Sequence, residues 1–224
     1  ATAAVGDAFI DGVSEFSARL AGVAAGRTMH PVYDHLVSAE ARSSGLFSKT
    51  AFFQLDEVVS ADRCDTSFSD EVDRNLLSRL SGGYRTFLVI NGQAKQPDLE
   101  ANRHRAAILE NGGLGLQLLA IGVNGHIGFN KPGCEPDSRR RVTELAMSTL
   151  ERNGYPAGTS AVTLGIAEIT SAQRIIIVAT GAVKSPAVTA MIEGPQLGAC
   201  LASLLRGHPD LMLFLDQAAA KDLS

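Results

Sequence analysis

Two short stretches of this sequence hold residues that could transfer protons. In QLDEVVS, Asp56 and Glu57 directly follow an apolar run, and in IGVNGHIGFNKPG, His126 lies among small residues after another. A carboxylate at a strand end is well placed to move a proton at a bound carbon, and histidine exchanges protons near neutral pH. Neighbouring side chains on a strand point to opposite sides, so only one of the two acids can face a given pocket. Solvated loop acids and a loop histidine bonded to backbone are the alternative interpretation.

Two further stretches could bind an anion. In AAGRTMHPVYDHL, Gly26 permits a tight turn and Thr28 precedes a helical pattern; in ATGAVKSPAV, Lys184 lies near the start of another. Backbone N–H groups at a helix start form an anion site where glycine allows close approach, and a lysine can neutralise a phosphate. A plain turn with Thr28 as the N-cap, and a solvated lysine, are equally consistent with these residues.

Six continuous apolar runs predict the strands that carry these residues. Continuous runs, unlike alternating ones, are typical of strands buried on both faces of a parallel sheet. The predicted strands are Arg19–Ala24, Thr50–Leu55, Arg85–Ile90, Leu116–Gly122, Arg174–Thr180 and Leu211–Asp216.

Helical patterns lie between these strands. They cover His30–Arg42, Thr66–Leu80, Pro97–Glu110, Thr163–Ser171, Ser185–Glu193 and Gln196–Arg206. Repeated strand–helix order predicts an α/β fold: a doubly wound, mostly parallel, Rossmann-like sheet with helices on both faces, in a single domain over residues 1–224. Ligands of such sheets bind outside the carboxyl ends of the strands, where all four polar stretches are expected.

The Asn124-Gly125 pair is also a hairpin signal. A hairpin needs a second strand immediately afterwards, but HIGFNKPG contains two glycines and a proline and does not alternate. We therefore predict a loop that leaves the carboxyl end of a buried strand.

Composition excludes several classes of protein. The net charge of −4 gives no basic excess for nucleic acid, and no apolar stretch approaches the ~20 residues of a membrane span. The start of the chain carries acids and does not resemble a secretory signal. The three cysteines are widely spaced, which argues against a zinc site or a disulfide framework and favours a reducing, cytoplasmic location.

The sequence resembles the glucosamine-6-phosphate deaminase family, within the wider group that includes 6-phosphogluconolactonases. The resemblance rests on GVNGHIGFNKPG and FFQLDEVVS, with looser matches in AGRTMHPVY, in the late strand–helix unit AVTLGIAEITSAQRIIIVATGAVKSPAV and in MIEGP. It covers the chain from about Ala21 onward. Asn before Gly-His, together with Gly128, is most similar to the galactosamine-6-phosphate branch.

The resemblance implies that a 2-amino-2-deoxyhexose 6-phosphate is converted to a ketohexose 6-phosphate and ammonia. Asp56 matches the base that moves the C2 proton to C1 through an enolamine, and His126 matches the group that opens the sugar ring. The implied phosphate contacts are Gly26, Arg27, Thr28 and Lys184, with Arg141 as a further candidate. The family uses no metal and no organic cofactor, and a homo-oligomer is compatible with the sequence.

Two residues depart from the family pattern beside the histidine. Asn124 replaces the usual Asp and brings no charge, and Lys131 replaces the usual Glu. Lysine cannot accept an imidazole N–H, and a nearby ammonium would disfavour a protonated His126. Three hypotheses remain open: an active deaminase, an isomerase of another sugar phosphate that uses Lys131, and a non-catalytic sugar-phosphate sensor. A lactonase is disfavoured because FNKP replaces the Ser-Leu-Phe-Pro type of segment.

Overall fold

The fold is described from a computed structural model, which describes residues 2–17, 19–60, 67–196 and 200–224. Its centre is a six-stranded sheet in the order β4-β2-β1-β5-β8-β9, in which all neighbours are parallel. The strands are β1 (Leu20–Val23), β2 (Ala51–Gln54), β4 (Thr86–Leu88), β5 (Leu114–Ala120), β8 (Arg174–Ala179) and β9 (Leu211–Leu215). All six predicted strands are confirmed, with ends shifted by a few residues.

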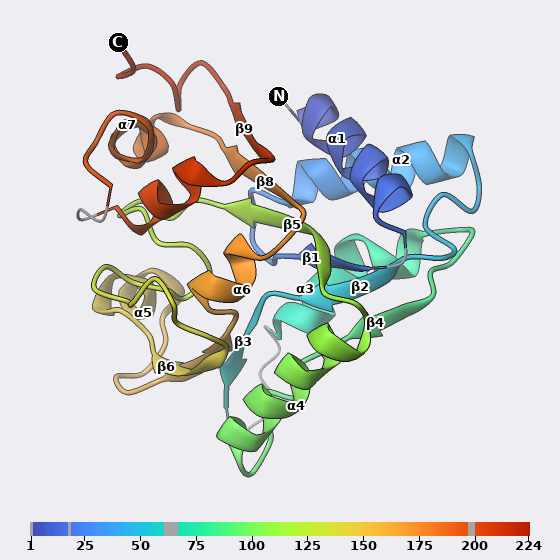
Figure 1. The fold of residues 1–224 in the computed structure, drawn as a ribbon, viewed down its shortest axis with the longest axis horizontal. Helices are drawn as coiled ribbons and strands as arrows, with labels where there is room; N and C mark the ends of the chain where they lie inside the picture. Colours follow the sequence, from blue (N-terminus) through green and yellow to red (C-terminus); the bar gives the residue numbers. More distant parts are fainter. Residues whose placement is uncertain (1, 18, 61–66, 197–199) are drawn as a thin grey trace.

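Helices cover both faces of this sheet (Figure 1). Helices α1 and α2 pack together on one face, where α1 contacts β5 and β8, whereas α4 and α6 lie on the other. The helices are α1 (Thr2–Glu15), α2 (His30–Arg42), α3 (Phe68–Asn75), α4 (Pro97–Glu110), α5 (Met147–Asn153), α6 (Ile166–Thr170) and α7 (Ser185–Ile192), with 3₁₀ turns at Leu77–Arg79, Ala182–Lys184 and Leu201–Gly207. The doubly wound α/β prediction is confirmed.

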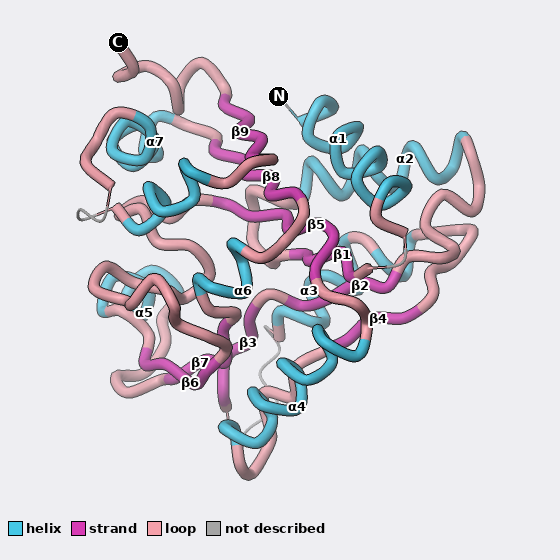
Figure 2. Tube along the Cα trace, viewed as in Figure 1, coloured by secondary structure: helices cyan, strands magenta, loops and turns pink. Residues whose placement is uncertain are grey.

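A second sheet was not predicted. Strands β3 (Asp56–Val59), β7 (Ser160–Thr163) and β6 (Arg141–Glu144) form a three-stranded antiparallel sheet that lies beside the main one (Figure 2). Only Leu55 separates β2 from β3, so one stretch of chain leaves the main sheet and enters the second. This junction places Asp56 at the point where the two sheets meet.

Three predicted helices differ from the structure. The helix expected from Thr163 begins only at Ile166, because Thr163 pairs with Asp56 in the second sheet and Gly165 stands at the helix cap. The helix expected over Gln196–Arg206 is a 3₁₀ helix from Leu201, with residues 197–199 outside the described part. The helix expected from Thr66, itself outside that part, is α3 followed by a 3₁₀ turn.

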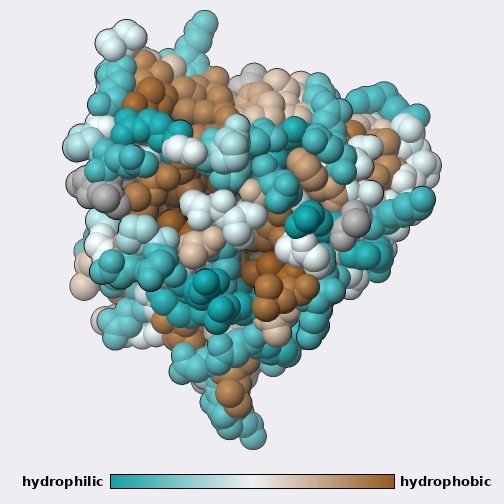
Figure 3. Space-filling view, in the orientation of Figure 1, coloured by the Kyte–Doolittle hydropathy of each residue, from teal (hydrophilic) through white to brown (hydrophobic). Residues whose placement is uncertain are grey.

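The core follows from the apolar runs. Side chains of β1, β2, β5 and β8 are almost wholly buried between the helix layers, as expected for strands covered on both faces. Strand β9 is at one edge of the sheet and its five residues are only half-buried. Apolar surface is accordingly visible near β9 in the upper part of Figure 3. Among the described residues, no helix is long and apolar enough to cross a membrane.

Candidate active site

A cleft of about 220 Å³ opens at the carboxyl ends of β1, β2 and β5. The main sheet reverses its strand order between β1 and β5, and such a switch point is where α/β sheets bind ligands. Four of the predicted site residues line this one cleft: Gly26, Asp56, His126 and Lys184. The polar strand ends therefore meet in space, although they lie far apart in the sequence.

Asp56 is held at the junction of the two sheets. The Leu55 N–H donates to Val23 O in the main sheet at 3.1 Å, and Leu55 O accepts from the Leu164 N–H at 3.0 Å beyond the end of β7. The Asp56 side chain is buried and accepts no hydrogen bond from the described residues. Burial, and to a lesser degree the Glu57 carboxylate, raises the pKa of Asp56 to about 7, while Arg140 opposes this shift. A carboxyl with a pKa near 7 suits a general base at neutral pH.

Glu57 points away from the cleft and has a structural environment. Its carboxylate accepts hydrogen bonds from the Gln54 side chain and the Ser67 hydroxyl, both at 2.9 Å. It also accepts from the backbone N–H group of Val58 on β3 and from those of Phe68 and Ser69 at the start of α3. These contacts agree with the expectation that only one of the two acids faces the pocket. The alternative of two solvated acids is wrong, since both lie buried on β3.

The His126 loop is a tight turn that leaves β5. The Gly122 N–H donates to His126 O at 2.8 Å, and Ile127 makes isolated bridges with Ile121 and Asn130. His126 Nδ1 lies 2.6 Å from the side-chain oxygen of Asn124, which can only accept, so Nδ1 is the donor. The loop prediction agrees with this geometry, and Asn124 supports the imidazole as an uncharged acceptor.

Glycines make room for the reactive groups. A Cβ on Gly122 would lie 2.2 Å from the Cε1 atom of His126, so a side chain there would displace the imidazole. Gly128, with φ +56°, packs on Thr163 and Asp56, where a Cβ would lie 3.3 Å from Asp56 Oδ2. Asn130, in contrast, is a structural residue: its side-chain amide donates to Ile127 O and Leu164 O.

The expected phosphate end of the cleft has its donors engaged by the protein itself. Gly26 has φ +118°, and its N–H donates to Glu71 Oε1 at 2.9 Å. The same Glu71 oxygen lies 2.7 Å from His30 Nε2 at the start of α2. Lys184 Nζ donates to Ile121 O at 2.6 Å. An anion at this end would have to share or replace these contacts.

The remaining predicted phosphate residues lie outside the cleft lining. Arg27 is exposed and Thr28 half-buried, and Thr28 is not the N-cap of α2, since Met29 occupies that position without a side-chain cap. The Arg141 guanidinium donates to Arg139 O at 3.1 Å and to Cys134 Sγ at 3.0 Å. The structure therefore does not bring Arg141 to the cleft.

Lys131 lies near the histidine but on its outer side. It is exposed and lines a small recess of about 10 Å³ together with His126, Phe129 and Thr149. Lys131 thus shares this recess with the ring-opening candidate, whereas Asp56 lines only the main cleft.

Helix α5 forms one wall of the cleft, and this wall was not predicted from the sequence. Ser148, Thr149 and Asn153 line it, as do the aromatic rings of Phe68 and Phe129, which stack with centroids 5.9 Å apart. The segment MSTLERN is too short for a clear helical period, so no reliable signal predicted it.

Metal chemistry has no obvious donor set in the described part of the chain. No group of three or more His, Cys, Asp or Glu side chains is placed there to hold a metal ion. Cys134 and Cys200 are free thiols, and Cys64 lies outside the described residues.

Comparison with known proteins identifies the family. Residues 3–211 match the family described as glucosamine-6-phosphate isomerases/6-phosphogluconolactonase. The chain belongs to this family. A glucosamine-6-phosphate deaminase from Cellvibrio japonicus is 33% identical over 226 residues, which cover 97% of this chain and 86% of that protein. One from Rhodopirellula baltica is 33% identical over 227 residues, covering 98% and 90%.

Solved structures agree with the assignment. A monomeric glucosamine-6-phosphate deaminase of the NagB superfamily has a TM-score of 0.89 and 28% identity, with 98% of this chain and 94% of that chain covered. The 6-phosphogluconolactonase from Trypanosoma brucei has a TM-score of 0.73 at 20% identity, covering 100% and 96%, and shows a common fold.

Proposed function

We propose that the chain deaminates and isomerises glucosamine 6-phosphate to fructose 6-phosphate and ammonia. The observation that carries the proposal is the position of Asp56, a carboxyl with a pKa of about 7 that shares one cleft with His126 and Lys184. The sequence similarity to glucosamine-6-phosphate deaminases over nearly the whole chain supports this chemistry over lactone hydrolysis.

In the proposed reaction, His126 opens the pyranose ring by moving a proton from the anomeric oxygen to the ring oxygen. With Nδ1 bonded to Asn124, Nε2 is the nitrogen that transfers this proton. Asn124 replaces the charge of a carboxylate by a neutral oxygen, so the imidazole is oriented without electrostatic stabilisation of its protonated form.

Asp56 then takes the C2 proton of the open-chain aldose and delivers it to C1. The intermediate is an enolamine, and its protonation at C1 gives a C2 imine. Water adds to that imine and ammonia leaves, which yields the ketose. The buried carboxylate suits this step, because it retains the abstracted proton when substrate excludes water from the cleft.

We assign the phosphate to the end of the cleft formed by Gly26 and Lys184, with Arg27 and Thr28 beside it. A backbone N–H at a glycine turn and a lysine ammonium are suitable donors for a phosphate dianion. Arg141 is omitted from the proposal, because it does not line the cleft and its guanidinium donates to Arg139 O and Cys134 Sγ. A cytoplasmic location and a homo-oligomeric state remain predictions.

Galactosamine 6-phosphate is the alternative substrate, suggested by Asn124 and Gly128. Both amino sugars should be assayed for ammonia and ketose, beside glucose 6-phosphate and 6-phosphogluconolactone. Ammonia from glucosamine 6-phosphate at the higher kcat/KM supports the proposal. Ketose from glucose 6-phosphate without ammonia from either amino sugar would instead indicate a plain isomerase, and binding without turnover a sensor.

The role of Lys131 is tested by Lys131→Glu. If Lys131 only weakens an inherited deaminase site, restoring a carboxylate next to His126 should raise kcat on amino sugars. A fall in kcat would show that the ammonium takes part in this chain's own mechanism. Lys95→Glu, at an exposed position outside the cleft lining, is the matched control for the change of charge.

A further inference from the structure

One arginine of the run Arg139-Arg140-Arg141 is buried behind the cleft. Arg140 is 4% exposed, whereas Arg139 is exposed and Arg141 half-buried. Its Nη2 donates to Gln54 O at 3.2 Å and to Leu55 O at 3.3 Å, the two carbonyls that directly precede Asp56. The guanidinium thus contacts the short corner where β2 passes into β3.

The Gln54 side chain also makes hydrogen bonds at this corner. The Gln54 side chain donates to Asp56 O at 2.9 Å, and its oxygen accepts from the Ile90 N–H at 2.8 Å. The Arg140 backbone N–H is bonded to Glu168, which also caps α6. Arg140 is therefore fixed through its main chain while its side chain reaches the residues that carry Asp56.

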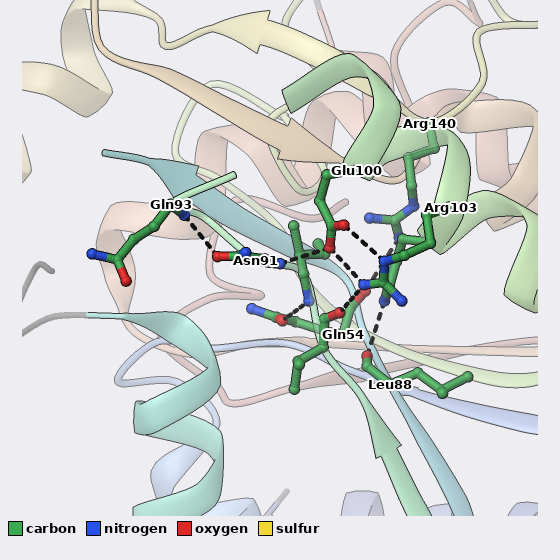
Figure 4. A network of polar contacts seen from close by, with 10 residues as sticks. Gln54, Leu88, Asn91, Gln93, Glu100, Arg103 and Arg140 are labelled. Carbon is green, nitrogen blue, oxygen red and sulfur yellow. Dashed lines mark hydrogen bonds and ion pairs between the residues drawn. The ribbon is translucent and has the colours of Figure 1, made fainter. Parts of the chain in front are cut away.

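The charge of Arg140 is not cancelled by a close partner. Its Nε and Nη1 atoms are buried and have no acceptor among the described residues, and no described carboxylate lies within ion-pair distance of it. Figure 4 shows the adjacent Glu100 carboxylate engaged by Arg103, at 2.5 and 2.7 Å, and by the Asn91 N–H at 2.7 Å. Arg140 is met by the two carbonyls and by the Phe53 ring, whose centroid lies 5.0 Å from Cζ. Burial of a cation is costly when no carboxylate lies close to it.

The charges around Arg140 are those of Glu168, Asp56 and Glu100. Burial lowers the pKa of Arg140 to about 9, which leaves it positively charged at neutral pH. Burial, and to a lesser degree the charge of Arg140, lowers the pKa of His104, so that this ring stays neutral. Among these three carboxylates, only Asp56 opens into the cleft.

We propose that Arg140 is a positioning residue for the reaction: its guanidinium fixes the corner at residues 54–56 and supplies a buried positive charge that favours the ionised, basic form of Asp56. This inference rests on the proposed function of Asp56. The charged and titratable groups that face Asp56 are Glu57 on its own strand, Tyr33 from α2 and His126 and Lys184 across the cleft. Glu57 acts against ionisation of Asp56, and Arg140 favours it.

The test is the titration of the Asp56 carboxyl by ¹³C NMR in protein labelled at aspartate, with the resonance assigned by its loss in Asp56→Asn. Arg140→Gln keeps an amide donor for the two carbonyls but removes the charge. We expect it to raise the Asp56 midpoint by about one pH unit or more. Arg140→Lys retains the charge and should stay within about half a unit of the wild type.

Arg103→Gln is the matched control, since it removes a cation from the same network but not one that acts on Asp56. An unchanged midpoint in Arg140→Gln, or an equal shift in Arg103→Gln, overturns the proposal. If Arg140→Gln does not fold, Arg140→Lys still decides the matter, because a rise of a full unit in that variant contradicts a role for the charge.

The acidic limb of kcat/KM for glucosamine 6-phosphate should move with the NMR midpoint. The NMR titration needs no turnover. Absence of ammonia release from the wild type would therefore refute the proposed function while leaving the assignment of Arg140 testable.

Discussion

The two ends of the cleft are built in different ways. At the reactive end, the buried side chain of Asp56 accepts no hydrogen bond from the described residues, and the His126 ring lies against Gly122. At the phosphate end, the Gly26 N–H and the Lys184 ammonium already bind the protein oxygens of Glu71 and Ile121. The reactive groups are therefore preorganised by packing, whereas the anion donors must exchange a protein partner for substrate.

The adjacent carboxylates of Asp56 and Glu57 have opposite environments. Glu57 accepts five hydrogen bonds from its surroundings and acts as a structural residue, while Asp56, one residue earlier, is left with a raised pKa. Strand alternation separates the two side chains, and burial decides which one can act as a base at neutral pH.

A side chain at position 122 should reduce activity, because it would displace the His126 imidazole. Gly122→Ala places a Cβ at the position of the His126 ring, and we expect kcat to fall by about 10²-fold or more, the scale of a lost acid–base group. The backbone of Gly122 is not in the left-handed region, so the fold should persist. Gly207→Ala, where a Cβ meets nothing, is the control. Equal activity of the two variants would show that His126 is not held as described.

Activity should depend on pH because the Asp56 carboxyl must be ionised to act as a base. Because Asp56 must be ionised and its pKa is about 7, kcat/KM should fall about tenfold for each pH unit below that value. Steady-state ammonia release between pH 5 and 9 measures this limb. A profile that stays flat down to pH 5 would mean that the essential base is an ordinary carboxyl.

The raised pKa also predicts a cost in stability. The folded state holds the Asp56 proton more tightly than the unfolded state, whose carboxyl has a pKa near 3.8. Stability from this group is therefore present at low pH and is lost as the pH rises from about 4 to about 7. Asp56→Asn cannot ionise, so its free energy of unfolding relative to the wild type should increase over that range, by up to about 4 kcal/mol.

Urea unfolding of both proteins at pH 4.5 and pH 8 measures this change. The difference between the two pH values isolates ionisation from any constant effect of the amide. A constant offset at both pH values would indicate that Asp56 is not desolvated.

The smallest expected effect is at the phosphate end. Glu71→Gln removes a negative charge from the acceptor of the Gly26 N–H, so a sugar phosphate should bind with a KM lower by about threefold at unchanged kcat, as for a partly exposed charge interaction. Initial-rate kinetics on glucosamine 6-phosphate measure this. A higher KM would show that Glu71 preorganises the loop instead of competing with the anion.

The main sheet could be predicted from the sequence, because strands that are buried on both faces have continuous apolar runs. The six continuous apolar runs marked the parallel strands, and their polar ends marked Gly26, Asp56, His126 and Lys184 as neighbours. The second sheet was missed because RVTE and SAVT are short, partly polar strands without a continuous apolar run. Helix α1 was not predicted, because its buried positions include Gly6 and Gly12, and glycine weakens both the apolar pattern and the helix propensity.

Arg140 shows most clearly which features could not be predicted from the sequence. In the run Arg139-Arg140-Arg141 the three residues are chemically identical, and only tertiary packing sends Arg140 into the core. The family resemblance made Arg141 a further candidate for a phosphate contact, but its guanidinium donates to Arg139 O and Cys134 Sγ. Strand-end chemistry can be predicted from the sequence, but the burial of one member of a charged run cannot.

The central claim is that Asp56 moves the C2 proton of the substrate. The most direct test follows the loss of deuterium from C2 of [2-²H]glucosamine 6-phosphate to solvent or to C1, in the wild type and in Asp56→Asn, with binding checked by calorimetry. If Asp56 is the base, the wild type transfers the label and the variant transfers none, at nearly unchanged affinity. Transfer of the C2 label at a similar rate by folded Asp56→Asn would contradict it.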